Sequence, residues 1–450
     1  MSLSGAEQYM LELINRGRLD PAGDAARYGT DLNAGLGPGQ INAQAKQVLA
    51  PNALLETAAI AHSQWMLQVD IFSHTGSGGS TLTDRVNATG YHWTALGENL
   101  GMSGTTGAIN MLAAMNEIYS GLFLSAGHRV NLLNDTYSEV GLGAETGVFT
   151  QSGTNYNTVM VTQDFGSGSG KAFLTGVAYS DTDKDAFYSI GEGRSGVSFT
   201  AQGITQYSEA AGGYAIGLTA AAAVTVTGKV NATAFSATVD MSHGNVKLDV
   251  VDGTTFLTSG NITLISGIQN VRLLGVGSLS ATGNGLDNRL TGNSGVNTLD
   301  GKAGNDVISG ANGNDRIFGG DGNDTLSGQN NNDEIHGGIG VDQISGGAGA
   351  DKIYGDAGND KLAGGTEADR FVFTKGGGAD VVSDFSLAQH DTLLLDDALW
   401  GGVVKTDQQV VSQFAHIVSG VVVFDFGGGQ TFQLSGVTTL TGLAAAIDFY

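Results

Sequence analysis

The chain of 450 residues contains no cysteine and only 3 prolines. Without cysteine there is no disulfide bond to stabilise a small domain. No run approaches the roughly 18 apolar residues of a membrane span, so we expect none. Positive charge is scarce: 20 Lys and Arg stand against 44 Asp and Glu, a net charge of −24. That balance disfavours nucleic acid and anionic membrane surfaces as partners. Residues 1–19 lack a basic stretch followed by an apolar one, so we expect no cleavable signal peptide.

Glycine is abundant instead, with 72 residues, and much of it follows a nine-residue period between Gly283 and Val372. In each of ten consecutive copies the first position is Gly and the eighth is apolar. The sixth position is Asn288 and Asn297 in the first two copies and aspartate in the others: Asp306, Asp315, Asp324, Asp333, Asp342, Asp351, Asp360 and Asp369.

Each of these columns has a physical reason. Glycine allows positive φ and close approach of the backbone to an ion, which suits a turn of six residues. The other three residues form a short strand in which only the middle side chain points inward, so only the eighth position is apolar. Coils stacked about 4.8 Å apart bring carboxylates into one column, where they repel unless cations lie between them. The pattern predicts a parallel β-solenoid that needs Ca²⁺ to fold.

The repeat resembles the RTX (repeats in toxin) β-roll, in which two nonapeptides form one coil. The resemblance implies calcium between the turns, and export to the outside of the cell by type I secretion machinery that reads an uncleaved C-terminal signal. Residues 444–450 are similar to such tails. Residues 378–385 and 391–395 resemble the segment that closes these rolls.

The first 168 residues have a different pattern. Apolar residues at helical spacing predict helices over residues 6–16, 52–68 and 107–122. Strands are expected later, at residues 140–144 and 159–164. Helices followed by late strands indicate an α+β domain or an α-β-α sandwich.

Three local motifs in this part are Ile-Phe-Ser-His-Thr-Gly at residues 71–76, Gly-Glu-Asn-Leu at 97–100 and Gly-His-Arg-Val-Asn-Leu-Leu at 127–133. Together with Gln-Asp-Phe-Gly at residues 163–166 they resemble a bacterial CAP domain, the fold shared by cysteine-rich secretory proteins, antigen 5 and pathogenesis-related proteins. The resemblance covers residues 6–166.

It implies a cleft lined by two histidines and one or two glutamates, which match His74, Glu98 and His128. The family's second glutamate is missing, because Ser125 stands at its place and Glu117 lies earlier. Two imidazoles and a carboxylate could hold Zn²⁺ with an open position or could act as general acid and base. The sequence leaves both open. A metal-dependent hydrolase or peptidase, and a cleft that only binds a lipid, peptide or glycan, are both compatible with it.

A further calcium loop is predicted at residues 181–192. Asp181, Asp183 and Asp185 stand at positions 1, 3 and 5, Phe187 offers its backbone carbonyl at position 7, and Glu192 closes the loop at position 12. Ala186 stands where glycine is usual, and no helix pattern flanks the loop. It is similar to loops in calcium-bound β-sandwich modules of bacterial surface proteins.

The sequence thus predicts a multidomain protein of mixed α+β and all-β class. Glycine and serine at residues 166–170 indicate a linker after an α-β-α domain of residues 1–168. We expect, in order, a small β-sandwich, early solenoid coils without calcium, the β-roll, and a β cap with the secretion signal; their ranges are residues 169–230, 231–282, 283–372 and 373–450.

Two functions remain open. In the first, a secreted calcium-binding CAP-domain protein binds or hydrolyses an extracellular peptide, lipid or glycan in its cleft. In the second, a non-catalytic adhesin or matrix protein uses its calcium roll and β-sandwich for interaction.

Overall fold

The computed structural model describes residues 3–168 and 170–449. Ser169, in the predicted linker, and Tyr450, at the end of the predicted tail, lie outside these residues. The chain divides into two compact units, Met1–Gly260 and Asn261–Tyr450. None of the helices in the described residues is long and apolar enough to cross a membrane. The α-helices are α1 (Gly5–Leu19), α2 (Pro21–Arg27), α3 (Ala53–Val69), α4 (Leu82–Ala88), α5 (Met111–Leu124), α6 (Ala126–Leu132) and α7 (Asp407–Phe414).

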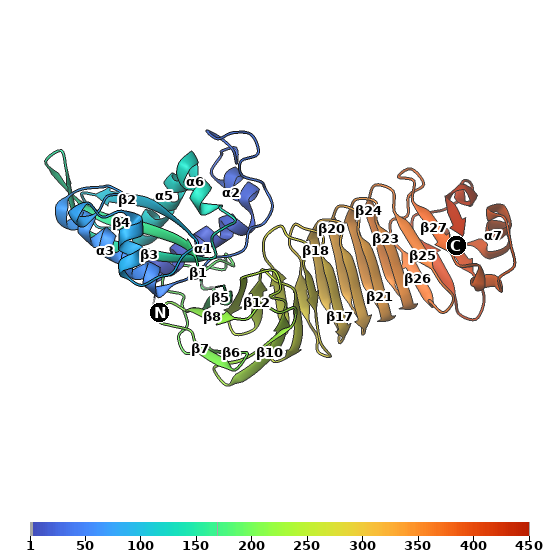
Figure 1. Cartoon of the computed structure of the whole chain (residues 1–450). Helices are drawn as coiled ribbons and strands as arrows, with labels where there is room; N and C mark the ends of the chain where they lie inside the picture. Colours follow the sequence, from blue (N-terminus) through green and yellow to red (C-terminus); the bar gives the residue numbers. More distant parts are fainter. Residues whose placement is uncertain (1–2, 169, 450) are drawn as a thin grey trace. The chain divides into compact units, whose positions relative to one another are not determined.

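The N-terminal part of the first unit is a four-stranded sheet between two layers of helices (Figure 1). Its strand order is β1-β3-β4-β2, with β1 parallel to β3 and the other neighbours antiparallel. Helices α3 and α4 cover one face, and α1, α5 and α6 lie on the other side. The expected α-β-α sandwich is confirmed. The strands are β1 (Ala50–Pro51), β2 (Ala95–Thr105), β3 (Glu139–Gln151) and β4 (Thr154–Ser167).

Local sequence explains where the long helices begin. Ser4 and Glu7 form a capping box at the start of α1, in which each side chain bonds the other residue's backbone N–H. The Asn52 side chain accepts hydrogen bonds from the backbone N–H groups of Leu54 and Leu55 at the start of α3.

Helix α3 packs very close to β3: a Cβ built on Gly141 would lie 2.0 Å from the backbone carbonyl carbon of Leu55. Glycine at this position therefore allows the helix to touch the sheet.

The rest of the first unit is a two-layer β-sandwich. One layer has the order β8-β5-β11-β12 and the other β7-β6-β9-β10. Rings from both layers meet in its core: Phe199 stacks on Tyr214 at 3.7 Å between centroids, and Phe235 meets Phe256 at 5.3 Å. The strands are β5 (Ala172–Tyr179), β6 (Ser198–Ala201), β7 (Ile204–Tyr207), β8 (Gly213–Leu218), β9 (Val224–Val230), β10 (Thr233–Val239), β11 (Val246–Val251) and β12 (Thr255–Thr258).

This sandwich is larger than the sequence predicts. The spacing of the strands predicts early solenoid coils over residues 231–282. Residues 262–282 do form the solenoid strands β13, β14 and β15, but β10 forms a hairpin with β9, and β11 pairs with β5 and β12. The physical reason is that β11 returns to β5 as a parallel neighbour, a long-range pairing that local spacing does not reveal. Residues 166 and 167 of the predicted linker continue β4.

Buried charges join the sandwich to the helical domain. The Lys247 ammonium lies 2.8 Å from a Glu12 carboxylate oxygen of α1 and also bonds Asp249. All three side chains are almost fully buried. Burial alone would lower the pKa of Lys247, but the two carboxylates outweigh it and raise that pKa. Lys247 therefore keeps its charge, and this contact fixes α1 against β11.

The second unit alternates short parallel strands between two sheets and is the predicted β-solenoid (Figure 1). Neighbours within a sheet are 18 residues apart, as in Leu299 opposite Ile317 and Ile308 opposite Leu326. Two nonapeptides therefore make one coil. The strands of one sheet are β13 (Ile262–Ser266), β15 (Ser280–Thr282), β17 (Thr298–Ala303), β19 (Arg316–Asp321), β21 (Glu334–Gly340), β23 (Lys352–Gly358), β25 (Arg370–Phe373), β27 (Thr392–Leu395) and β31 (Ile447–Phe449).

The second sheet of the solenoid repeats the same pattern. Its parallel strands are β14 (Asn270–Leu273), β16 (Arg289–Thr291), β18 (Val307–Asn312), β20 (Thr325–Asn330), β22 (Gln343–Ala348), β24 (Lys361–Thr366), β26 (Ala379–Val382) and β30 (Thr431–Leu434), followed by the antiparallel β29 (Val421–Asp425) and β28 (Ala415–Val418). The eighth-position side chains are at most 3% exposed and form the core.

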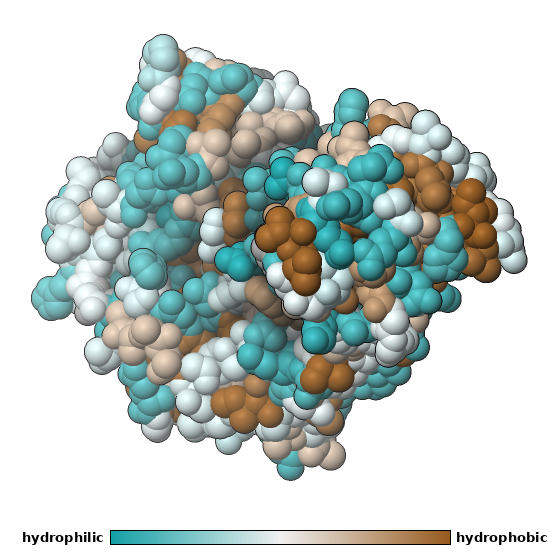
Figure 2. Space-filling view, turned by 90° about the vertical axis from the view of Figure 1, so that its right-hand side faces the viewer, coloured by the Kyte–Doolittle hydropathy of each residue, from teal (hydrophilic) through white to brown (hydrophobic). Residues whose placement is uncertain are grey.

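In the view of Figure 2, hydrophobic residues gather in several small patches separated by hydrophilic ones.

Candidate functional site

The aspartate column of the roll has one carboxylate oxygen in use and one unpaired. In each aspartate from Asp306 to Asp369, Oδ1 accepts the backbone N–H of the residue 18 positions earlier; for example, Asp324 N donates to Asp342 Oδ1 at 2.8 Å. Oδ2 of all eight is buried and has no hydrogen-bond partner among the described residues. A row of orphaned anionic oxygens is costly unless a cation satisfies them.

The surroundings of these oxygens fit calcium. A Cβ built on Gly301 would lie 2.1 Å from Asp306 Oδ2 and 2.5 Å from the Gly319 carbonyl oxygen of the next coil. The first-position glycine therefore leaves a small cradle lined by carboxylate and carbonyl oxygens. These are the ligands that Ca²⁺ prefers, at 2.3–2.6 Å. The same arrangement recurs at Gly310, Gly319 and Gly328.

Burial also changes the acidity of the column. Because these carboxyls are buried, their pKa rises above its ordinary value, although the N–H bond to Oδ1 lowers it. The pKa reaches about 6 in four of them and about 7 in three; the first four are Asp306, Asp315, Asp351 and Asp360, and the others are Asp333, Asp342 and Asp369. Without a cation, the folded roll therefore holds protons near neutral pH.

The column differs at its two ends. Asn288 and Asn297 hold the first two positions with neutral amides; Asn288 Nδ2 donates to the Gln269 carbonyl at 3.0 Å. Beyond the repeats, Asp380 and Asp391 continue the column by accepting N–H groups of Asp360 and Asp369. The nine-residue period does not predict either of them, because the spacing lengthens to 20 and 22 residues. Burial raises the pKa of Asp380 to about 8.

In the helical domain, the structure brings His74 and Glu98 into contact. His74 Nδ1 lies 2.7 Å from Glu98 Oε1. The Glu98 side chain is 4% exposed and that of His74 is 61% exposed. Glu98 comes from the edge strand β2, and Gly97 before it permits a close approach, since a Cβ there would lie 2.3 Å from the Tyr137 hydroxyl. A buried carboxylate thus anchors a solvent-facing imidazole.

Arg85 of α4 completes this contact, and the sequence analysis did not select it. Its guanidinium donates to Glu98 Oε2 and to the backbone carbonyls of His74 at 3.0 Å and Ser80 at 3.1 Å. Arg85 therefore neutralises the buried Glu98 and holds the His74 loop. The sequence offers little indication of this role, because Asp84-Arg85 is only a dipeptide and not a longer motif.

His128 lies on the neighbouring helix α6. Asn99 of β2 donates to the His128 backbone carbonyl at 3.2 Å, and Asn131 donates to the Glu98 carbonyl at 3.1 Å. Burial and the nearby His74 lower the pKa of His128, which favours the neutral imidazole. The two histidines are thus near enough to interact electrostatically, although no hydrogen bond joins their side chains in the described structure.

Asp164 is the second site residue that the sequence analysis did not select, although its tetrapeptide helped to identify the domain. It stands opposite Glu98 in the β2–β4 ladder and is 0% exposed. Burial first, and then the charge of Glu98, raise its pKa well above the usual range. Both of its carboxyl oxygens are buried without a hydrogen-bond partner in the described residues, so the site favours the neutral acid beside the charged Glu98.

Ser125 and Glu117 were the two further residues expected at the cleft. Ser125 caps the start of α6 with no side-chain bond to the helix backbone, and exposed Glu117 accepts a hydrogen bond from Ser103 at 2.5 Å. In the described residues no hydrogen bond or ion pair joins either one to His74, Glu98 or His128. Glu117 lies within α5, and Ser125 is the residue between α5 and α6.

The residues present do not form the zinc site that the sequence left open beside acid–base chemistry. Glu98 and the Nδ1 atom of His74 bond each other, and Arg85 places a positive charge on the remaining Glu98 oxygen. Within the described residues, only Asp181, Asp183 and Asp185 form a group of at least three His, Cys, Asp or Glu whose ligand atoms all lie within 4.8 Å of one another.

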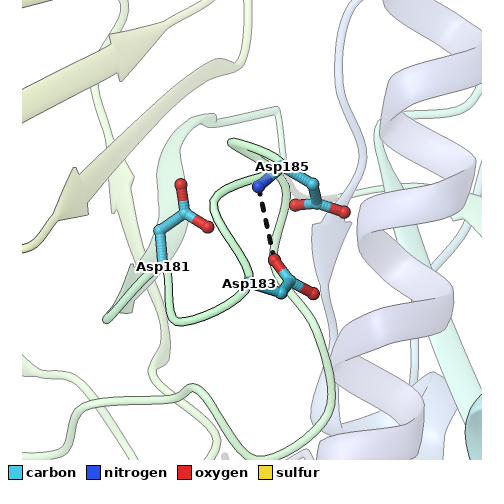
Figure 3. Close-up of side chains that lie close together, drawn as sticks. All are labelled: Asp181, Asp183 and Asp185. Carbon is cyan, nitrogen blue, oxygen red and sulfur yellow. Dashed lines mark hydrogen bonds between the residues drawn. The ribbon is translucent and has the colours of Figure 1, made fainter.

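That group is the loop predicted to hold calcium (Figure 3). Asp183 Oδ1 accepts the Asp185 N–H at 3.3 Å, and Ala186 adopts the positive φ of 59° usually taken by glycine. Glu192, expected to close the loop, does not belong to this group of three. Its two oxygens accept the N–H groups of Thr182 at 2.7 Å and Ser189 at 2.8 Å, so it shapes the loop from inside. The Phe187 ring packs edge-on against Tyr9 of α1 at 6.0 Å.

Comparison with known families agrees with this arrangement. Residues 11–165 match the model of the cysteine-rich secretory protein family, CAP. Three overlapping segments, residues 282–317, 309–344 and 336–371, match the RTX calcium-binding nonapeptide repeat. The chain therefore contains a CAP domain and RTX repeats, and the repeats bind calcium. This combination supports a secreted calcium-binding protein.

Solved structures give partial likenesses only. An extracellular protein containing a SCP domain from Bacillus anthracis str. Ames is 27% identical over 27% of this chain and 34% of its own, with a TM-score of 0.20. An outer surface protein from Borrelia burgdorferi is 16% identical over 27% of this chain and 78% of its own, with a TM-score of 0.21. The extracellular lipase LipA from Serratia marcescens is 14% identical over 40% of this chain and 45% of its own, with a TM-score of 0.19.

The match thus spans about a third of the length of the Bacillus protein. Likenesses with these TM-scores carry no argument about activity. No curated protein matches the chain.

Proposed function

We propose that the protein leaves the cell unfolded through a type I system and folds outside, when calcium enters the roll. The observation that carries this is the column of eight buried Oδ2 atoms without a hydrogen-bond partner in the described residues. Extracellular calcium modules have dissociation constants of roughly 10⁻⁴–10⁻³ M, so such sites stay empty at cytosolic calcium levels. Metal binding then supplies the free energy of folding.

Circular dichroism of the full chain tests this proposal. In EGTA at neutral pH we expect the strand signal of the second unit to be missing, and a few millimolar Ca²⁺ should restore it. Mg²⁺ at the same concentration serves as control, because it demands a smaller octahedral site and gives up its water reluctantly. Equal spectra with EGTA and with Ca²⁺ would exclude calcium-driven folding.

For the CAP domain we propose that the cleft around His74, Glu98 and His128 binds an extracellular peptide, lipid or glycan. The exposed His74 imidazole, anchored by buried Glu98, supports this role. If Nδ1–H points to Glu98, Nε2 faces outward as a base or hydrogen-bond acceptor. The same geometry favours acid–base hydrolysis as a second candidate, since a carboxylate that fixes the tautomer of an imidazole recurs in hydrolases.

The double variant His74→Ala/His128→Ala decides whether the cleft is functional. Peptide mixtures, phosphatidylcholine vesicles and neutral glycans are the probes, and binding and cleavage are both followed. We expect the double variant to lose whichever of these the calcium-loaded protein shows. His416→Ala, an exposed histidine of the second unit, is the matched control. Unaltered binding and cleavage in the double variant would remove the cleft from consideration.

We also propose one calcium ion in the loop of Asp181, Asp183 and Asp185. The close grouping of three carboxylates supports it, as does the buried Asp181 Oδ1 atom, which lacks a hydrogen-bond partner in the described structure. Equilibrium dialysis with radioactive calcium should show one ion fewer per chain in Asp183→Asn/Asp185→Asn. An unchanged count would exclude the loop as a site.

A further inference from the structure

A cavity of about 480 Å³ lies within the first unit, where the helical domain meets the β-sandwich. This volume falls in the usual range of small-ligand sites, and such sites favour junctions between domains. Its walls come from the start of α1, from the ends of β1 and β3, and from β5, β7 and β8. None of His74, Glu98 and His128 lines it, so it is separate from the CAP cleft.

One wall presents aromatic and apolar side chains. Tyr207, at the end of the edge strand β7, is 60% exposed, and Ile204 on the same strand is 42% exposed. Phe173 of β5 and Tyr214 of β8 stand beside them. The Tyr214 ring is buried against Phe199 and its hydroxyl is bonded to the Leu248 carbonyl at 2.6 Å, so Tyr214 only supports this wall. Tyr207 thus provides a flat and accessible aromatic surface.

The lining also includes polar side chains that are fixed before any ligand arrives. Gln8 of α1 is 1% exposed, and its amide donates to Glu12 at 2.8 Å. Its Oε1 atom is held against β8, where a Cβ on Gly213 would lie only 2.0 Å away. Asn52 donates to Glu139 at 2.6 Å. Side chains already held by the protein lose little conformational entropy when they bind.

The composition of the walls selects the chemistry of a ligand. Five lining side chains are amides or carboxylates, which is too polar for an acyl chain: Gln8, Asn52, Glu139, Gln206 and Glu209. Two of these are glutamates and only one lining residue, Lys171, is a cation, which disfavours phosphates and other anions. A neutral sugar ring suits both the aromatic and the polar lining. Its C–H face packs on an aromatic ring, and its hydroxyls donate to and accept from amides and carboxylates.

We propose that this cavity is a second ligand site, which binds a short neutral oligosaccharide, with one sugar ring stacked on Tyr207 and its hydroxyls bonded to Gln206 and Glu209. This site does not depend on the CAP cleft or on its ligand. It would let the protein attach to a glycan through the junction of its two N-terminal domains while the cleft remains open.

Isothermal titration calorimetry of the full, calcium-loaded chain tests the site, with triacetylchitotriose, cellotriose and maltotriose as probes. At least one should bind, and Tyr207→Ala should weaken that binding at least tenfold. Gln206→Ala should weaken it less, since a single hydrogen bond is lost. Tyr156→Ala, a tyrosine of β4 outside the cavity, is the matched control and should bind like the unaltered protein.

Circular dichroism must show that Tyr207→Ala is folded, which its exposed position on an edge strand makes the expected result. Absence of binding to all three sugars at millimolar concentration would overturn the proposal. So would equal binding by Tyr207→Ala and the unaltered protein. A sugar that is lost in His74→Ala but kept in Tyr207→Ala would bind in the CAP cleft instead, and that outcome also overturns the proposal.

Discussion

The backbone N–H of Asp324 donates to Oδ1 of Asp342 at 2.8 Å, one coil further along the roll. The other oxygen of Asp342 is buried and has no hydrogen-bond partner in the described part of the chain. Each aspartate therefore has two roles: one oxygen holds the neighbouring coil, and the other is left for a cation. The same side chain that fixes the register of the roll makes its stability depend on calcium.

Acid should partly replace calcium in folding the roll. The folded pKa is about 6 to 7 in seven of the eight aspartates, against an ordinary value near 3.9. A raised folded pKa stabilises the fold fully below the unfolded pKa, and this contribution is lost as the pH rises through 6 to 7. In EGTA we therefore expect more strand signal at pH 5 than at pH 7.5.

Circular dichroism across this range measures the effect, with sedimentation as control for aggregation near the isoelectric point of about 4.4. With saturating Ca²⁺ the spectra at pH 5.5 and 7.5 should differ less. A strand signal that falls on acidification in EGTA would contradict the role given to these carboxyls.

Replacing one aspartate in the middle of the column should raise the calcium requirement. In Asp342→Asn the buried oxygen becomes neutral, as in Asn288 at the start of the column, and the ion loses an anionic ligand. We expect the calcium midpoint of folding to rise several-fold. Asp321→Asn, an exposed aspartate of the same roll, removes the same charge and should leave the midpoint nearly unchanged. Equal shifts in both variants would mean that net charge, and not ligation, sets the midpoint.

The roll was the most predictable part because its signal is periodic. One inward residue per strand and one glycine per turn fix the coil, and Leu299 opposite Ile317 follows from the nine-residue period alone. Asp380 escaped prediction because two inserted residues broke that period, although the parallel pairing of β24 with β26 continues. Local repetition predicts structure well as long as the spacing is kept.

The CAP cleft was only partly predictable. Motifs indicated His74, Glu98 and His128, but the sequence of β2 is rich in glycine and polar residues and gave no strand signal. Without that strand, Asp164 could not be placed opposite Glu98, and Arg85 could not be seen as its counter-ion. These contacts depend on how the strands of the sheet pair, and one sequence does not encode that pairing locally.

Removing Arg85 should destabilise the CAP domain strongly. Arg85 is 9% exposed and faces a Glu98 that is 4% exposed, so Arg85→Leu leaves a buried carboxylate beside Asp164. Loss of one partner of a buried pair costs about 3–5 kcal/mol. Tryptophan fluorescence during thermal unfolding in calcium reports this domain through Trp65 and Trp93 once Trp400 of the second unit is replaced by Phe in both proteins.

Arg27→Leu is the matched control. Arg27 is 51% exposed and pairs with Asp24, which also keeps Arg16 as a partner, so we expect a loss of at most about 1 kcal/mol. If both variants melted at the same temperature, Arg85 would not be the group that stabilises buried Glu98.

Two glycine substitutions of equal size should act in opposite directions. A Cβ on Gly143 would lie 2.4 Å from the backbone carbon of Ala59 in α3, so Gly143→Ala must push the helix from the sheet. We expect it to lower the stability of the CAP domain by about 1–3 kcal/mol. Gly121 lies inside α5 with no atom within 4 Å of a Cβ built there. Gly121→Ala should therefore raise stability by about 0.5–1 kcal/mol, because alanine loses less backbone entropy in a helix. Chemical denaturation in calcium, followed by tryptophan fluorescence, measures both. A stable Gly143→Ala variant would show that α3 does not need this close contact with β3, and that the separation of helix and sheet is set elsewhere.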